Sequence, residues 1–217
     1  MHVGGHSRGG RHGTIDVSAY DRSSPGEGAA FSGDRAWERH SSAEFRDAIA
    51  KAERSAEHRN HGYRQYNDAG GGGGAFGRYQ LRQGVLMDAG WMDNLGRWTG
   101  KAASHGVKND VDFLDHPEAQ EAAMTDVLRV YDRQARALGV DRYVGQVITG
   151  LNGSRIRITR AGIIAAVHRV GVAGVADSLA RLTTNNKANN RKDKDRDTLV
   201  RKRLREFDRI AYQPEHK

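Results

Sequence analysis

The spacing of apolar residues in the middle of the chain limits the fold more than any other feature of the sequence. Between Phe45 and Leu182, apolar residues recur at helical spacing in several separate segments, which is the pattern of helices that each bury one face. The same region contains no convincing strand pattern. The sequence therefore predicts a mainly α fold.

Capping residues, proline and glycine set the expected helix limits. Ser42 and Thr159 are candidate N-caps. Pro117 lies near a first helical position, with Glu118 and Glu121 close to the positive end of the helix dipole. We expect helices at about residues 42–57, 85–90, 117–139, 159–171 and 172–182.

Composition divides the chain into three regions. Residues 1–40 are polar and show no period, which predicts a flexible arm. Residues 41–182 form the expected helical domain, with a mobile loop at Gly70–Gly74. Residues 183–217 form a basic tail, in which positions 187–217 hold 11 Lys or Arg and 6 Asp or Glu. Four apolar residues are spaced for an amphipathic helix in this tail: Leu199, Leu204, Phe207 and Ile210.

Charge and cysteine content restrict the possible chemistry. The formal net charge is +8, so the surface attracts polyanions such as nucleic acid, anionic headgroups or cell-wall polymers. The chain has no cysteine, which excludes disulfides, thiolate catalysis and cysteine-based zinc sites. His58 and His61 lie close in sequence, but no His-Glu-x-x-His zinc pattern occurs. We therefore expect neither a metal nor a bound cofactor.

Three segments carry a resemblance to a known family. They are Ala48-Ile-Ala-Lys-Ala-Glu53-Arg-Ser55, Gly77-Arg-Tyr-Gln-Leu81 and Ala165-Ala-Val-His-Arg-Val-Gly171. In this order they resemble the lysozyme-like superfamily, in its branch of lytic transglycosylases and goose-type lysozymes, over roughly residues 41–182. The resemblance implies a lysozyme-like helical domain that cleaves peptidoglycan glycan strands between N-acetylmuramic acid and N-acetylglucosamine, with one glutamate as general acid and base.

The chain departs from the family pattern at two of these segments. Arg54-Ser55 stands where the family has Ser-Gly after the glutamate, and Val167-His168 stands where it has Tyr-Asn. The loop between the glutamate and Gln80 is also longer than usual because of the glycine run. These departures concern the detailed mechanism more than the fold.

Glu53 is the preferred candidate for the catalytic acid. Glycoside cleavage needs a carboxylic acid that stays protonated near neutral pH, and burial beside an apolar helix face favours the protonated form. Glu53 lies four residues after Ile49 and directly after Ala52, so it borders the apolar face. A solvated glutamate that pairs with nearby lysines or arginines is the alternative. Glu57 is the competing candidate, because it gives a loop length closer to that of the family.

The resemblance also implies substrate-binding residues. Tyr79 and Gln80 are expected to line the groove, and His168 replaces an asparagine that contacts the sugar. Tyr79 has core packing as its alternative, and His168 has the alternative of a satisfied core histidine. Tyr66 and Asn67 are further sugar-binding candidates.

The reaction outcome depends on a second carboxylate. Asp68 is the nearest candidate for a base or nucleophile, and its alternative role is that of a turn residue beside the glycines. Lytic transglycosylases need no second carboxylate, because the N-acetyl group and the C6 hydroxyl of the sugar supply that chemistry. The sequence thus favours a transglycosylase over a hydrolase.

Two functions follow as hypotheses. The first is a peptidoglycan-degrading enzyme that acts at the bacterial cell wall or periplasm. No signal-peptide segment and no membrane span are evident, so we expect phage delivery, attachment to a virion or export by other machinery. The second is an inactive module of a virion or secretion assembly, whose basic tail binds nucleic acid or cell wall.

Overall fold

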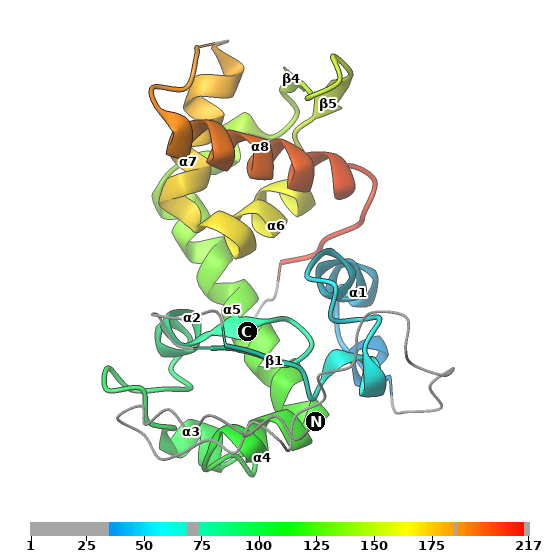
Figure 1. Ribbon diagram of the computed structural model, residues 1–217, viewed down its shortest axis with the longest axis vertical. Coiled ribbons are helices and arrows are strands. Elements are labelled where there is room, and N and C mark those ends of the chain that lie inside the picture. The colour runs from blue at the N-terminus through cyan, green and yellow to red at the C-terminus, as the bar shows by residue number, and fades with distance from the viewer. Residues whose placement is uncertain (1–34, 69–73, 185, 215–217) are drawn as a thin grey trace, which may run out of the picture. The chain divides into compact units, whose positions relative to one another are not determined.

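The computed structural model describes residues 35–68, 74–184 and 186–214 (Figure 1). Most of the expected arm and the glycines at positions 70–73 lie outside these residues. The chain divides into two compact units, Met1–Val127 and Leu128–Lys217, and the boundary falls within helix α5, Pro117–Ala137. With 56% helix and 8% strand, the structure confirms the mainly α prediction.

Short elements make up much of the first unit. Its helices other than α5 are α1 (Ala43–Ala52), α2 (Gln83–Asp88), α3 (Gly100–Ala103) and α4 (Asp110–Asp115). Two 3₁₀ helices, η2 and η3, cover Ala36–Arg39 and Arg59–Gly62. Three strands form an antiparallel sheet in the order β1-β2-β3: Tyr66–Asn67, Ala75–Phe76 and Leu81–Arg82.

Helix α1 ends at Ala52, well before the expected limit at Glu57. Arg54 adopts the left-handed conformation with φ of 63°, and the Ser55 amide donates to the Ala50 carbonyl at 3.0 Å. This is a Schellman-type ending, in which glycine usually occupies the left-handed position. The apolar spacing continues past the true end of the helix, so spacing alone gave too long a helix.

The core of the first unit is aromatic. The Trp98 and Phe113 ring centroids lie 4.9 Å apart, and Phe76 contacts both rings edge-on. Trp91 is fully buried against Phe113. Because β2 contributes Phe76 to this cluster, the sheet is fixed to the helices that follow it.

Ordered structure begins earlier than the expected boundary at residue 41. Ala36 and Trp37 of η2 are buried and pack with Tyr63. The polar composition of the arm hid this short apolar pair, because two buried residues produce no detectable period.

In its described residues, the second unit combines the end of α5 with a 3₁₀ helix, a hairpin and the helices α6, α7 and α8. After the end of α5 come η4 (Val140–Tyr143), β4 (Val147–Thr149), β5 (Arg155–Arg157), α6 (Arg160–Val170), α7 (Val172–Thr183) and α8 (Arg191–Glu206). Thr159 caps α6 as predicted, since its hydroxyl accepts from the Gly162 amide at 3.0 Å. Gly171 separates α6 from α7, also as predicted.

Helix α8 forms within the basic tail and lies across α6 and α7 (Figure 1). Val200, Leu204 and Phe207 are buried. A Cβ atom at Gly162 of α6 would lie 3.0 Å from Leu204 Cδ2 and 3.1 Å from its Cα, so glycine permits the close approach of α6 and α8. The tail thus supplies part of the core of the second unit.

The strands were not foreseen, because segments of two or three residues are too short to show alternation. In the described residues, no helix combines the length and the apolar composition that a membrane crossing requires.

The buried position of Leu204 gives a test of the role of α8. We expect Leu204→Ala to lower the free energy of unfolding of the second unit by about 2–5 kcal/mol, through lost apolar burial and a cavity. Lys202→Ala, on the exposed side of the same helix, should change it by less than about 0.5 kcal/mol. Urea denaturation followed by circular dichroism measures both. Equal, small effects would show that α8 does not contribute to the core.

Candidate active site

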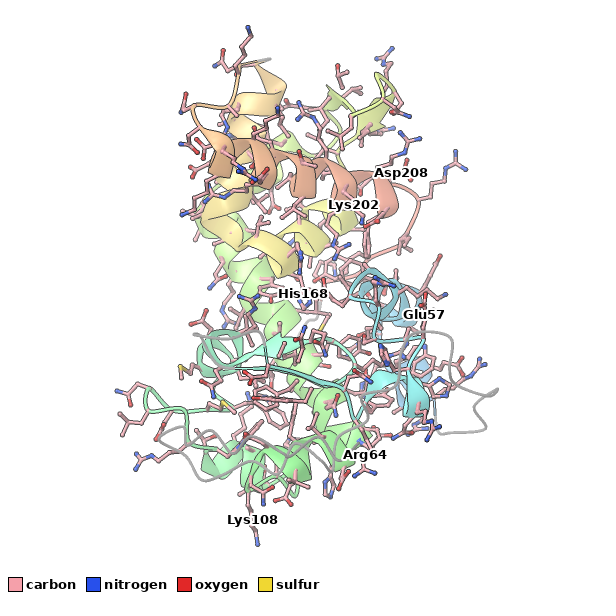
Figure 2. All side chains as sticks on the ribbon, in the orientation of Figure 1. Glu57, Arg64, Lys108, His168, Lys202 and Asp208 are labelled. Atoms are coloured by element: carbon pink, nitrogen blue, oxygen red, sulfur yellow. The ribbon has the colours of Figure 1, made fainter. Side chains whose placement is uncertain are left out.

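Glu53 stands at the C-terminal end of α1. It is the C-cap residue, its amide donates to the Ile49 carbonyl at 2.9 Å, and its side chain is half-buried. Glu57 lies on the exposed turn that follows (Figure 2). Of the two candidate acids, Glu53 is therefore the one with partial shielding from water, which is the property that the proposed chemistry needs.

The segment after Glu53 is tied to the turn between β2 and β3. The Ser55 hydroxyl lies within hydrogen-bond distance of the Arg78 carbonyl and is 3.0 Å from the Ala50 carbonyl. The Arg78 guanidinium pairs with Asp47 of α1 at 2.6 Å. These contacts hold the end of the acid-bearing helix against the turn that carries Tyr79 and Gln80.

Arg78 is itself fully buried, which is unusual for arginine. Its guanidinium lies 3.6 Å from the centroid of the Trp37 ring and donates to the His61 carbonyl at 2.7 Å. The ring face and the Asp47 carboxylate compensate for the loss of hydration. Arg78 thereby joins α1, η2 and η3 around one cation.

The shape of the turn depends on Gly77 and Gln120. Gly77 has φ of 67°, and a Cβ there would collide with the Gln120 side chain. Gln120 accepts from the Arg78 amide at 3.0 Å and donates to the carbonyls of Tyr63 and Phe113, both at 2.8 Å. The Gln120 amide group thus holds three separate backbone segments in place.

Gln80 occupies a strained position in this turn. Its φ is 49°, in the left-handed region that residues other than glycine rarely adopt. Its side-chain amide donates to the Gly77 carbonyl at 2.9 Å, and the residue is half-buried. Such strain is typical of residues held in place at functional sites.

A buried carboxylate lies behind the turn. Glu121 of α5 has no exposed surface and forms an ion pair with Arg46 of α1 at 2.9 Å. The hydroxyls of Tyr63 and Tyr79 donate to its other carboxylate oxygen at 2.8 and 2.7 Å. Burial and the Glu121 charge raise the pKa of both tyrosines above the usual range.

This network corrects the expected role of Tyr79. Its side chain is fully buried and is engaged with Glu121, so the structure places it in the core and not on a substrate surface. Core packing was the alternative for this residue. The sequence predicted only that Glu121 lies near the positive end of the helix dipole. In the structure its carboxylate is also the centre of a buried network.

Strand β1 carries the two other binding candidates of the first unit. Tyr66 is half-buried, with its ring centroid 5.2 Å from that of Phe76. Burial and the charges of Asp68 and Asp110 raise the pKa of Tyr66. Asn67 and Asp68 are exposed at the edge of the sheet. Pairing of β1 with β2 brings Tyr66 and Asn67 to the sheet from which the Gln80 turn extends.

His168 belongs to the second unit and is described there by itself. It is half-buried on α6, and its Nδ1 atom lies 3.3 Å from the hydroxyl of the buried Tyr131 (Figure 2). A polar partner at this distance is compatible with the alternative of a satisfied core histidine.

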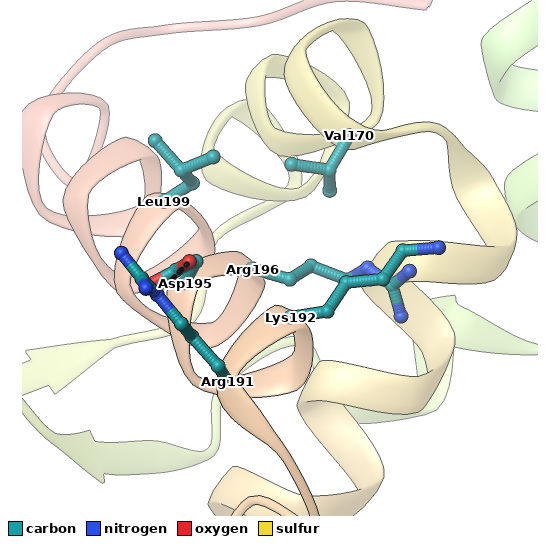
Figure 3. Close-up of a pocket in the computed structure, with 6 residues that line it drawn as sticks. All are labelled: Val170, Arg191, Lys192, Asp195, Arg196 and Leu199. Atoms are coloured by element: carbon teal, nitrogen blue, oxygen red, sulfur yellow. Dashed lines mark ion pairs between the residues drawn. The ribbon is translucent and has the colours of Figure 1, made fainter.

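A pocket between α6 and α8 lies outside the predicted site. Val170 and Leu199 supply its apolar part, and Lys192 and Arg196 lie at its polar side (Figure 3). The two other charged residues of the lining, Arg191 and Asp195, form an ion pair at 3.9 Å. The carboxylate that lines it, Asp195, is exposed, so we do not assign the proposed bond cleavage to this pocket.

The sequence did contain a signal for the buried network. Gln120 precedes Met124 and Leu128 at four-residue spacing, so it lies on the helix face that carries these buried residues. Glu121 lies next to it on the same face. A polar pair inside an apolar stripe indicates buried hydrogen bonding, but the sequence does not identify the partners.

Loss of the Glu121 charge should destabilise the first unit. In Glu121→Gln the two tyrosines keep an acceptor, but Arg46 stays buried without its counterion, so we expect a loss of about 3–5 kcal/mol in the free energy of unfolding. Glu118→Gln is the matched control, because Glu118 is exposed on the preceding turn of α5, and it should cost less than about 1 kcal/mol. Chemical denaturation distinguishes the two; similar losses would contradict the proposed importance of the buried pair.

The raised tyrosine pKa values predict a loss of stability at alkaline pH. The unfolded tyrosines ionise near pH 10, whereas the folded state holds Tyr63 and Tyr79 protonated. The unfolded state therefore binds fewer protons above about pH 10, and stability falls by up to about 1.4 kcal/mol per pH unit for each tyrosine. Denaturation midpoints should fall less steeply with pH in Tyr63→Phe than in the wild type. An unchanged slope would show that Tyr63 does not contribute.

Comparison with known proteins did not identify a family for this chain. A scan against protein-family models, a search of the curated proteins and a search of the solved structures each found no match to this chain. The resemblance to lysozyme-like enzymes stays a prediction from three short segments.

Proposed function

We propose that this chain is a lysozyme-like enzyme that cleaves the glycan strands of peptidoglycan between N-acetylmuramic acid and N-acetylglucosamine. The observation that carries the proposal is the arrangement around Glu53. This half-buried carboxylate ends α1, and Ser55 connects the following residues to the Gln80 turn. The two segments that define the resemblance in the first unit are thus neighbours in space, although 23 residues separate Ser55 from Arg78.

Glu53 would act first as a general acid. Its proton passes to the glycosidic oxygen as the bond from that oxygen to C1 of N-acetylmuramic acid breaks. The carboxylate that remains then accepts a proton from the group that attacks C1. If the C6 hydroxyl of the same sugar attacks, a 1,6-anhydro ring forms, and if water attacks, a reducing end forms. Either route returns the proton to Glu53.

The exposed position of Asp68, the candidate for a second carboxylate, favours the anhydro product. Asp68 is exposed after β1, whereas a nucleophile or base requires shielding from water. Gln80, Tyr66 and Asn67 are the residues of the first unit that we propose to contact the sugar. Tyr79 would support them from the core.

Isosteric removal of each acid tests the assignment. We expect wild-type protein to release soluble muropeptides from purified sacculi, and Glu53→Gln to lower the rate by roughly 10²–10⁴-fold, the usual contribution of a general acid. Glu57→Gln is the matched control and should retain activity within a few-fold. Mass spectrometry of the products distinguishes anhydro ends from reducing ends.

The possible outcomes decide between the hypotheses. Full activity of Glu53→Gln with loss in Glu57→Gln would transfer the acid role to Glu57. No release by folded wild-type protein would refute the enzyme proposal and favour the inactive binding module. Circular dichroism of each variant ensures that a loss of activity is not a loss of folding.

A further inference from the structure

Exposed apolar side chains gather at the β4–β5 hairpin of the second unit. Leu151 at the hairpin turn is 64% exposed, and Val144 and Val147 are 45% and 44% exposed. Turns that face water usually carry polar residues or glycine. A large apolar residue at this turn, with two more apolar residues just before it in the chain, calls for a partner that covers them.

The hairpin holds Leu151 in a defined position. The turn is closed by hydrogen bonds from the Gly153 amide to the Gly150 carbonyl at 3.1 Å and from the Gly150 amide to the Ser154 carbonyl at 2.7 Å. Arg205 of α8 donates to the Asn152 side chain at 2.9 Å. These hydrogen bonds therefore fix the conformation of the turn that carries Leu151.

Strand pairing sorts the hairpin side chains into two faces. Ile148 and Ile156 are paired and buried, whereas the flanking pairs Val147–Arg157 and Thr149–Arg155 are exposed. The outer face thus combines an apolar residue with two arginines. Apolar and positively charged side chains therefore share one face of the hairpin.

The arginines around the hairpin carry uncompensated charge. In the described part of the chain, no ion pair involves Arg155 or Arg157, and the recorded side-chain partners of Arg201 and Arg205 are neutral: the Thr149 carbonyl and the side chains of Asn152 and Ser154. The nearby carboxylate of Glu206 is engaged by Arg203 at 2.8 Å and Lys202 at 3.8 Å. The hairpin and the adjoining part of α8 therefore carry positive charges that can bind an anionic partner.

An anionic phospholipid surface fits both features at once. Phosphate headgroups bind arginine, and the boundary between headgroups and acyl chains accepts exposed leucine and valine side chains. A nucleic-acid backbone or an anionic wall polymer would use the charges but would leave Leu151 in water, and no aromatic residue on the hairpin is available for base stacking.

We propose that the β4–β5 hairpin docks the protein on the surface of an anionic phospholipid bilayer. Leu151 and Val147 enter the boundary region, and Arg155, Arg157 and Arg205 bind the headgroup phosphates. Such docking adds a membrane surface to the places where this chain acts, and it does not depend on the catalytic role proposed for Glu53.

Vesicle sedimentation tests the proposal with the full-length chain. We expect binding to vesicles of phosphatidylcholine with phosphatidylglycerol, weaker binding at high salt, and little binding to phosphatidylcholine alone. Leu151→Ser should lower the affinity by roughly tenfold, through loss of the apolar contact. Arg155→Gln with Arg157→Gln should lower it by roughly 10–30-fold, through loss of two cations near the anionic surface.

Matched controls come from the first unit. Leu95 is 58% exposed, so Leu95→Ser removes a comparable apolar residue that does not belong to the hairpin. Arg82→Gln with Lys108→Gln removes two exposed cations of that unit. Both controls should bind the anionic vesicles as the wild type does. All variants should keep the wild-type circular dichroism spectrum and melting temperature, because every substituted residue is exposed.

Three results would overturn the proposal. One is the absence of wild-type binding to anionic vesicles. Another is a Leu151→Ser variant that binds as well as the wild type, which would reduce the surface to non-specific charge. The third is binding of duplex DNA that depends on Arg155 and Arg157 but not on Leu151, without vesicle binding, which would assign the surface to nucleic acid.

Discussion

The buried carboxylate of Glu121 connects the parts of the first unit on which the candidate site depends. It joins α5 to α1 through Arg46 and to two further segments through Tyr63 and Tyr79. A buried ion pair is not by itself a large source of stability, because desolvation offsets much of the attraction. Its geometry is nevertheless demanding, since each partner that is misplaced leaves a buried charge or hydroxyl unsatisfied. This demand fixes the turn before Gln80 relative to α1, which ends at Ala52 and has Glu53 as its C-cap.

Arg46 and Arg78 are both buried in the first unit but have different partners. Arg46 neutralises Glu121 within the core, whereas Arg78 stacks on Trp37 and pairs with Asp47. Arg78 also contributes the carbonyl that contacts Ser55. These contacts connect α1, the helix that Glu53 caps, to α5 and to the turn between β2 and β3. We propose that the two arginines thereby help to position Glu53.

The second unit shows how a basic segment can be both core and surface. Leu204 and Phe207 of the tail pack inward, and Asp197 anchors α8 to Arg181 at 2.6 Å. The hydrogen bond and charge of Asp197 raise the pKa of Arg181. Other arginines remain for the surface, where Arg205 supports the hairpin turn. The same helix therefore stabilises the unit and shapes the face that we propose to meet an anionic bilayer.

The sequence by itself determined the mainly α character, the helix that Thr159 caps and Gly171 ends, and the helix within the tail, because periodicity and capping are local properties. It also singled out Glu53 and Gln80 as candidates, but not the contact between Ser55 and Arg78 that connects their two segments. The end of α1, the short strands and the network around Glu121 were decided only by tertiary structure. The physical reason is that Arg54 in a left-handed conformation and a buried carboxylate with distant partners are stabilised by contacts between segments far apart in the chain, which local spacing does not encode.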